Sequence, residues 1–404
     1  MPGTPVPDAG QRQGQSAAGR GLHRVEVKPE LLQWACNRSG RSIEELNKRP
    51  KLKKLDTWLQ GGLNPTFKQL EDFAKATYTP IGYFFLDEPP DEVLPVTDFR
   101  TVSDQEVQRP SPNLLDTLYL CQRRQDWYRR EALAAGEPQL VFVGSLTTND
   151  EIFESAAKIR DVLEFNIEQR RQLPNWFEAL RHFILQAETS GILVMVNGVV
   201  GDNTHRKLDP EEFRGFALVD PVAPLIFING ADSKAAQMFT LAHEIAHVWL
   251  GQSGVSNSRL ARFTASGIER WCNRVAAELL VPSRLIRDEY DKNAELSVEI
   301  NRLARYFKVS TLVILRRIYD EQKINRDEFW SAYHDEMKRI TEKNTGNGGN
   351  YHYTTSARAS KRFARALIAS ALEGRTTLKE AMRLLGVNKM SAFMKVAKNL
   401  KVIR

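Results

Sequence analysis

The segment His243-Glu244-Ile245-Ala246-His247 constrains this chain more than any other. On an α-helix, residues four positions apart lie on one face, so both imidazoles can reach one metal ion. The flanking residues, 240–242 and 248–250, carry no charge, as a buried helix requires. A surface helix that carries two histidines by coincidence is the alternative. The chain has only seven histidines, however, and an uncharged context is unusual on a surface. The segment therefore predicts a buried helix that presents a metal site.

A zinc ion bound by two histidines needs a third protein ligand. Glu269 and Asn273 are one helical turn apart in the downstream segment 267–282, so Glu269 could bind the metal while Asn273 hydrogen-bonds a ligating histidine. Glu278 is a competing ligand, although its Ala/Leu-rich context also fits a solvent-facing position. Cys272 is another competitor, because it lies three residues past Glu269 and could share its face. Two histidines and one carboxylate form the usual peptidase set, which favours Glu269.

The glutamate of the motif supplies the chemistry that two histidines alone lack. Glu244 lies beside both imidazoles and can accept a proton from water that the metal activates. We therefore expect Zn²⁺ as the cofactor and Glu244 as the catalytic base. A zinc hydrolase also uses a cationic or phenolic donor to stabilise the oxyanion. The candidates for that donor are Tyr351, His352, Tyr353, His205 and Arg214.

Helical and extended patterns along the chain predict a mixed α+β fold. Ser42 with Glu45 and Thr66 with Gln69 have the capping-box spacing that opens a helix. Two extended segments, 213–220 and 225–229, are separated by a short proline-containing turn and predict an antiparallel pair. These segments could supply the sheet edge that aligns an extended peptide.

The length of 404 residues predicts two or three domains, at about 150 residues each. Composition shifts and proline- or glycine-rich stretches place their boundaries. The predicted organisation is a disordered tail at 1–24, a helical domain at 25–86, a linker at 87–105, a central domain at 106–343, a linker at 344–350 and a basic helical tail at 351–404.

Charge is distributed unevenly. The formal net charge is +7, yet residues 351–404 carry twelve Lys or Arg and only two Glu, which makes the other 350 residues −3. This basic tail favours an anionic partner, nucleic acid first, although a solvated helical face is the alternative. Three distant cysteines indicate reduced thiols, and no apolar run approaches the ~20 residues of a membrane span. These features predict a cytoplasmic protein without a membrane partner.

Four segments, in this order, resemble the core of the ImmA/IrrE family of zinc metallopeptidases: FRGFALVD, PLIFING, FTLAHEIAHVWLG and ERWCNRVAAELLVP. The resemblance covers about residues 190–320. It implies a zincin-like core with a gluzincin-like site, to which the extended pair described above would contribute a small antiparallel sheet. In that site His243, His247 and Glu269 bind zinc, and Glu244 is the catalytic base. It also implies that the substrate is a repressor whose cleavage releases a stress response or a mobile element.

The region before this core resembles the start of long ImmA/IrrE proteins that begin with a helix-turn-helix of the Xre (Cro/C1) type. The segments that carry the resemblance are LNPTFKQLEDFAKATYTPIGYFFLDEPP and LPVTDFRT. A full Xre domain has a recognition helix before the Trp-x-x-Gly element, here Trp58 to Gly61, but only residues 49–54 fill that interval, so the recognition helix is shortened or missing. Cations in this stretch could hold DNA phosphates with little base readout; they are Lys48, Arg49, Lys51, Lys53 and Lys54.

Together these features predict a zinc-dependent endopeptidase that cleaves one protein regulator. The alternative is a DNA-binding regulator or antitoxin-like protein whose zinc site is structural or sensory. The complete motif favours the enzyme, because a structural site needs no glutamate at position 244. Hydrolysis of a small amide is a further alternative.

Overall fold

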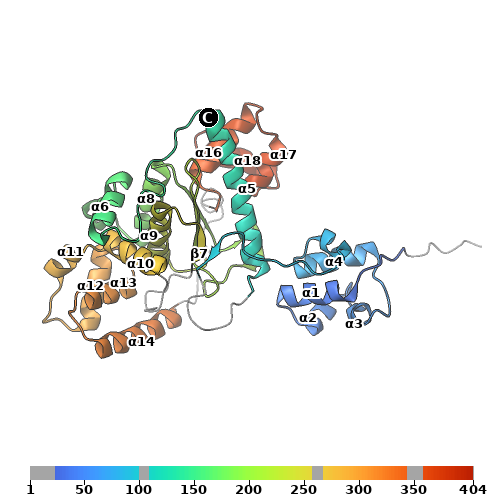
Figure 1. Ribbon diagram of the computed structural model, residues 1–404, viewed down its shortest axis with the longest axis horizontal. Coiled ribbons are helices and arrows are strands. Elements are labelled where there is room, and N and C mark those ends of the chain that lie inside the picture. Colours follow the sequence, from blue (N-terminus) through green and yellow to red (C-terminus); the bar gives the residue numbers. More distant parts are fainter. Residues whose placement is uncertain (1–22, 100–108, 257–266, 344–357, 404) are drawn as a thin grey trace, which may run out of the picture. The chain divides into compact units, whose positions relative to one another are not determined.

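The computed structural model describes residues 23–99, 109–256, 267–343 and 358–403. The chain divides into two compact units between Glu92 and Val93. The expected α+β class is confirmed, since helices of the second unit cover a small mixed sheet (Figure 1). None of the helices in the described ranges is long and apolar enough to cross a membrane.

The secondary-structure elements assigned in the described part of the N-terminal unit are all helices, and two of them begin as the sequence predicts. The Thr66 and Gln69 side chains form a reciprocal capping box, and the Ser42 side chain accepts a hydrogen bond from the Glu45 backbone N–H. Glu92 pairs with Arg38 at 2.6 Å, so this unit includes residues that we expected in the linker. Its elements are α1 (Pro29–Ser39), α2 (Ile43–Asn47), α3 (Leu55–Leu59), α4 (Phe67–Thr77) and the 3-10 helix η1 (Ile81–Phe85).

A five-stranded sheet forms the centre of the second unit, with the strand order β1-β7-β5-β6-β2. The predicted antiparallel pair is confirmed as β5 and β6, with Gly215 opposite Ile228. The sheet as a whole is mixed rather than antiparallel, because β2 runs parallel to β6 and β1 parallel to β7. The strands are β1 (Thr97–Asp98), β2 (Leu193–Asn197), β5 (Gly215–Leu218), β6 (Leu225–Asn229) and β7 (Gly254–Ser256), beside a hairpin of β3 (Val199–Val200) and β4 (Asn203–Lys207).

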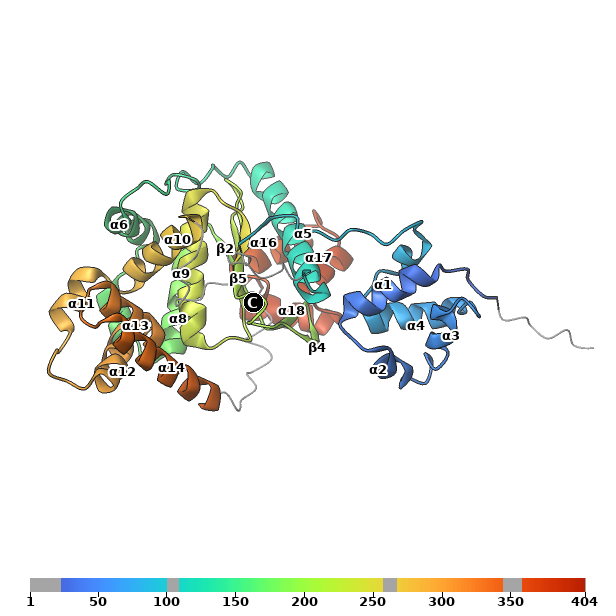
Figure 2. The ribbon, with the colours of Figure 1, turned by 60° about the horizontal axis from the view of Figure 1, so that its bottom comes forward.

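Alternate residues of the strands enter two separate hydrophobic cores, as the pleat of a sheet requires. Val194 and Ala217 belong to one core, whereas Leu193 and Phe216 belong to the other. The first core lies under α6, α8, α9 and α10, and the second under α5 and α16 to α18 (Figures 1 and 2). The helices of the first side are α6 (Ile152–Leu163), α7 (Ile167–Gln172), α8 (Trp176–Thr189), α9 (Lys234–Leu250), α10 (Gly267–Leu280), α11 (Ser283–Glu289), α12 (Leu296–Phe307), α13 (Thr311–Asp320) and α14 (Arg326–Lys343).

The described part of the basic tail packs onto the second face of the sheet and shares its core. Buried Glu188 accepts hydrogen bonds from Ser360 Oγ, at 2.6 Å, and from the Lys361 backbone N–H. Buried Arg124 donates to the Leu384 carbonyl at 2.8 Å. These contacts join the tail helices to α5 and α8 as one compact unit. The helices of this side are α5 (Pro112–Ala134), α16 (Lys361–Leu372), α17 (Leu378–Leu385) and α18 (Met390–Asn399).

Candidate metal centre

The helix that carries the motif, α9, is buried along nearly its whole length. The Ser233 side chain caps its first turn by accepting a hydrogen bond from the Ala236 backbone N–H, and Gly251 ends it in the left-handed conformation with φ of 70°. Every residue from Gln237 to Leu250 is buried, between α8, α10 and strand β5 (Figure 2). This position places two polar imidazoles in an apolar interior, which requires partners for them.

Those partners come from α9 itself and from α10. His243 Nε2 and His247 Nε2 lie 3.1 Å apart. Glu269 Oε1 is 2.9 Å from His247 Nε2, and Glu269 Oε2 is 3.4 Å from His243 Nε2. One ligand atom from each of these three buried residues lies within 4.8 Å of the others. The second nitrogens, Nδ1 of both histidines, make no hydrogen bond within the described ranges. Two imidazole nitrogens and one carboxylate oxygen that converge in this way fit a tetrahedral zinc ion with one position left open.

The electrostatics of the three groups reflect burial and mutual attraction. Burial lowers the pKa of His243, but the Glu269 charge and its hydrogen bond outweigh that effect and raise the pKa above the ordinary 6.5. Burial dominates at His247 and lowers its pKa. The Glu269 carboxyl is also desolvated, yet the two histidines hold its pKa well below the usual range. Glu269 is therefore ionised at neutral pH, as a metal ligand must be.

Glu244 is buried beside this cluster and is held by a residue that sequence reasoning missed. Ser256 Oγ, at the end of β7, donates a hydrogen bond to Glu244 Oε1. Glu244 Oε2 has no hydrogen-bond partner in the part of the chain that is described. Burial raises the pKa of Glu244 to about 8, against the opposing effects of His243 and Ser256. At this pKa the carboxyl is mainly protonated at neutral pH. A cation bound at the cluster would lower the pKa of Glu244 and favour the charged form, which can accept a proton.

The competing third ligands lie outside the cluster. Glu278 is buried, not solvent-facing as its context suggested, because it pairs with Arg317 at 2.7 Å and accepts a hydrogen bond from Ser283 Oγ at 2.7 Å. Cys272 is also buried, and burial raises the pKa of its thiol well above the ordinary value. A thiol in that state is a poor metal ligand, since only the thiolate binds. The geometry favours Glu269 over both.

Asn273, predicted to orient a ligating histidine, lies on α10 beside His243. Its side chain contributes to the raised pKa of that imidazole. Neither Asn273 Oδ1 nor His243 Nδ1, however, makes a hydrogen bond of normal geometry within the described ranges. Asn273 therefore approaches the cluster from the expected side without a well-formed bond.

A second feature missed from the sequence is the segment that covers the far side of His247. Phe99 stacks on the His247 ring with centroids 5.1 Å apart. Its backbone N–H donates to the Val255 carbonyl at 3.0 Å, which extends the pairing of β1 with β7. A Cβ at Gly254 would lie 2.1 Å from a ring carbon of Phe99, so only glycine fits there. Phe99 lies in the segment LPVTDFRT. The resemblance of that segment to long ImmA/IrrE proteins did not predict a contact with the metal site.

The prediction that segments 213–220 and 225–229 supply a sheet edge for a peptide is wrong. β5 has β6 on one side and β7 on the other, and β6 lies between β5 and β2, so both strands are interior. β7 is interior as well, because β1 pairs with its other side, so the edge strands are β1 and β2. Isolated strand patterns do not reveal this order, because strand neighbours are set by long-range pairing.

None of the remaining predicted residues that the structure describes belongs to the His–His–Glu cluster. Arg214 pairs with Asp232 at 3.3 Å, and His205 is exposed on β4. Tyr351, His352 and Tyr353 lie outside the described residues. The five cations of the N-terminal unit are all exposed between or beside α2 and α3, with Lys51 paired to Asp72 at 3.0 Å. No helix forms over residues 48–54, so this interval carries no recognition helix.

Residues 187–319 match the Peptidase_M78 family model, described as the IrrE N-terminal-like domain. The match contains α9, α10 and the whole His–His–Glu cluster, and it supports a metallopeptidase of the ImmA/IrrE type with a zincin-like core. Residues 359–399 match a domain of unknown function, DUF8813. No curated protein is a significant match to this chain. The N-terminal unit lies outside both matched ranges.

Substitution of Gly215 by alanine is expected to destabilise the protein and displace Glu244. A Cβ there would lie 2.7 Å from Thr240 Cγ2, 2.9 Å from the Phe227 carbonyl oxygen and 3.0 Å from Glu244 Oε1. Overpacking of this kind costs about 1–3 kcal/mol. Urea unfolding measures the loss, with Gly82→Ala as the control because a Cβ at Gly82 meets nothing within 4 Å. Equal stability of both variants would show that α9 does not need this glycine to approach the sheet.

Metal affinity is expected to fall as the pH drops through the pKa of His243. Only the neutral imidazole binds metal, so a proton competes with the ion. The pKa of His243 is raised, so competition begins at a higher pH than for an ordinary histidine. Below that pKa, each pH unit costs about 1.4 kcal/mol, or about tenfold in affinity, per proton displaced. Chelator competition from about pH 5 to about pH 8 measures the slope; a flat profile would contradict this account.

Proposed function

We propose that this protein is a zinc-dependent endopeptidase that cleaves a specific protein regulator in a stress-response or mobile-element switch. The observation that carries the proposal is the convergence of His243, His247 and Glu269 beside the buried Glu244. The two-histidine, one-carboxylate set is the ligand set of catalytic zinc in peptidases. The regulator as substrate rests on the resemblance to ImmA/IrrE proteins.

In this proposal His243, His247 and Glu269 hold the zinc ion. When bound, zinc supplies Lewis-acid chemistry that polarises a peptide carbonyl and acidifies water. Glu244 Oε2, which has no hydrogen-bond partner among the described residues, would accept a proton from the attacking water, while the Ser256 hydroxyl fixes Oε1. The protonated carboxyl then passes that proton to the leaving amine. Phe99 covers one face of the His247 ring and limits the motion of that ligand.

New protein termini in cells test this function and identify the substrate in the same experiment. The wild type and Glu244→Gln are each expressed in matched cells, and the N-termini of cellular proteins are compared by mass spectrometry. The proposal expects one or a few termini that only the wild type produces. Termini scattered over many proteins would contradict a specific substrate, and identical termini in both samples would contradict peptidase activity.

A second candidate is a DNA-binding regulator whose metal site is structural or sensory. The exposure of all five cations near α2 and α3 favours it. Without a recognition helix, these side chains can contact phosphates but read few bases, so DNA binding should be strongly salt-dependent and weakly sequence-dependent. Two results would favour this candidate over the peptidase. Cellular protein termini would be the same with the wild type and Glu244→Gln, and neutralising Lys53 and Lys54 would reduce the salt dependence of DNA binding.

A further inference from the structure

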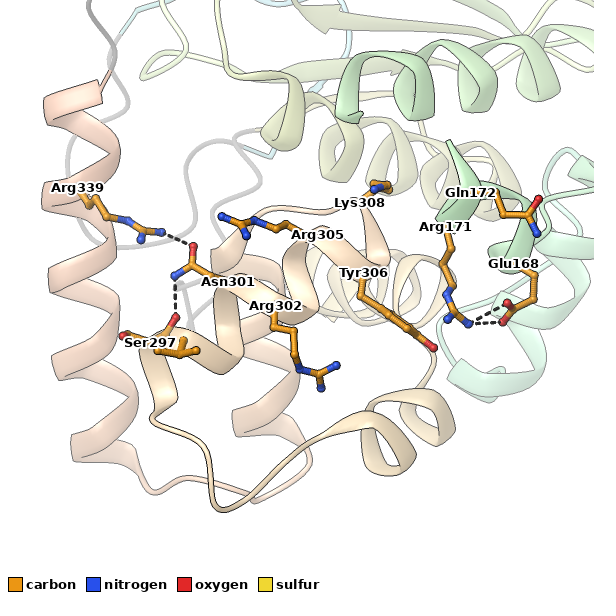
Figure 3. A pocket seen from close by; sticks show the side chains of 11 residues that line it. Glu168, Arg171, Gln172, Ser297, Asn301, Arg302, Arg305, Tyr306, Lys308 and Arg339 are labelled. Atoms are coloured by element: carbon orange, nitrogen blue, oxygen red, sulfur yellow. Dashed lines mark hydrogen bonds and ion pairs between the residues drawn. The ribbon is translucent and has the colours of Figure 1, made fainter. Parts of the chain in front are cut away.

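A large hollow lies away from the metal centre, among α7, α12 and α14 (Figure 3). Its volume is about 960 Å³. Eleven residues line it, of which five are Arg or Lys and one is a carboxylate, Glu168. The others are amides and hydroxyls, with Val298 as the aliphatic exception among them. Small-molecule pockets are lined mainly by apolar side chains, so this lining indicates a highly charged ligand.

Three of the five cations are held in place by carboxylates. Arg171 donates to both oxygens of Glu168, at 2.9 and 2.8 Å. Arg302 pairs with Glu299 at 2.8 Å and more loosely with Glu289 at 3.9 Å, and Arg339 pairs with Glu336 at 2.6 Å. A guanidinium has five N–H donors, so these carboxylates leave donors for a ligand. These pairs fix the orientation of the three arginines and partly neutralise them.

The other two cations are Arg305 and Lys308, at the C-terminal end of α12. Neither side chain makes a hydrogen bond or ion pair within the described ranges. Both line the hollow, between the α7 and α14 sides in Figure 3. They are therefore the cations that an incoming anion would contact without first breaking an ion pair.

The geometry also limits how a ligand could be recognised. The Arg171 guanidinium lies 3.7 Å from the centroid of the Tyr306 ring and occupies that ring face. A nucleobase could not stack on the same face, so recognition would rest on the anionic groups. Arg forks match phosphate oxygens closely, and cations from three helices can meet several charges at once. We propose that this hollow binds a small molecule with two or more linked phosphate groups, either a free oligophosphate or a nucleoside polyphosphate.

Duplex nucleic acid fits this site less well. A helix-turn-helix places an exposed helix in the major groove, whereas α13, which follows α12, is largely buried. Its buried residues are Val313, Ile314, Leu315, Arg317 and Ile318. The cations line a hollow instead of a projecting helix. The inference does not depend on the peptidase proposal, since none of these residues belongs to the metal cluster.

Calorimetric titration of the full-length protein at about 0.15 M salt tests the inference. The probes are sodium triphosphate, ATP, adenosine and a short DNA duplex. We expect triphosphate and ATP to bind with similar affinity and adenosine not to bind. Arg305→Gln/Lys308→Gln should weaken triphosphate binding by about tenfold or more. The control Arg130→Gln/Lys379→Gln removes the same charge from exposed positions on α5 and α17 and should bind like the wild type.

Four results would overturn the inference. They are no binding of either phosphate probe, equal weakening in both double variants, binding of ATP without triphosphate, and binding of the duplex alone. Metal content measured on the same samples separates this test from the peptidase proposal, because the pocket variants should keep the metal of the wild type.

Discussion

Replacement of Glu244 by glutamine is expected to lower peptide cleavage by about 100-fold to 10,000-fold, the range for loss of a general base. Glutamine keeps the size of the side chain, and its Oε1 can still accept the Ser256 hydrogen bond. It cannot accept a proton from water. The His–His–Glu cluster does not include position 244, so the variant should keep its metal.

The measurement compares cleavage rates of the substrate that the termini experiment identifies. Ser256→Ala is the matched companion, because it removes the hydroxyl that fixes Glu244 without removing the base. Its rate should lie between those of the wild type and Glu244→Gln. Full activity in Glu244→Gln, with metal retained, would mean that another group takes the proton.

Glutamine variants of the two glutamates that compete as the third ligand are expected to have different effects. Glu269→Gln should lose the metal, since an amide oxygen carries no charge for the ion and the carboxylate contacts to both histidines disappear. Glu278→Gln should keep the metal but lose stability, because it leaves the Arg317 guanidinium without its closest buried counterion. Breaking a buried pair costs about 3–5 kcal/mol. We expect the lower end, as Glu321 lies 4.0 Å from Arg317.

Metal content by mass spectrometry and urea unfolding are measured on both variants. We expect Glu269→Gln to lose the metal and Glu278→Gln to show the larger loss of stability. Retention of metal in Glu269→Gln together with its loss in Glu278→Gln would reverse the assignment of the third ligand.

The helix of the motif could be predicted because its signals are local. The uncharged flanks and the four-residue spacing of the histidines predict a buried helix, and the structure has one in α9 (Lys234–Leu250). The spacing of Glu269 and Asn273 likewise reflects a single helical turn, which α10 provides. Caps at Ser42 and Thr66 were predictable for the same reason.

The remaining parts of the site depend on contacts between distant segments. Phe99 reaches His247 only because β1 pairs with β7, and no pattern in either short strand specifies that pairing. Glu278 looked solvent-facing because its buried partner, Arg317, lies 39 residues further along the chain. The phosphate-binding hollow has the same origin, since its cations come from three helices.

Metal content of the purified full-length protein, measured beside His243→Ala, decides whether His243 belongs to a zinc site. We expect about one zinc ion per wild-type chain and its loss in the variant, with the helical content of both proteins unchanged by circular dichroism. Absence of zinc from the wild type, even after zinc is added under reducing conditions, would contradict the peptidase proposal and leave a regulator built on a zincin-like fold.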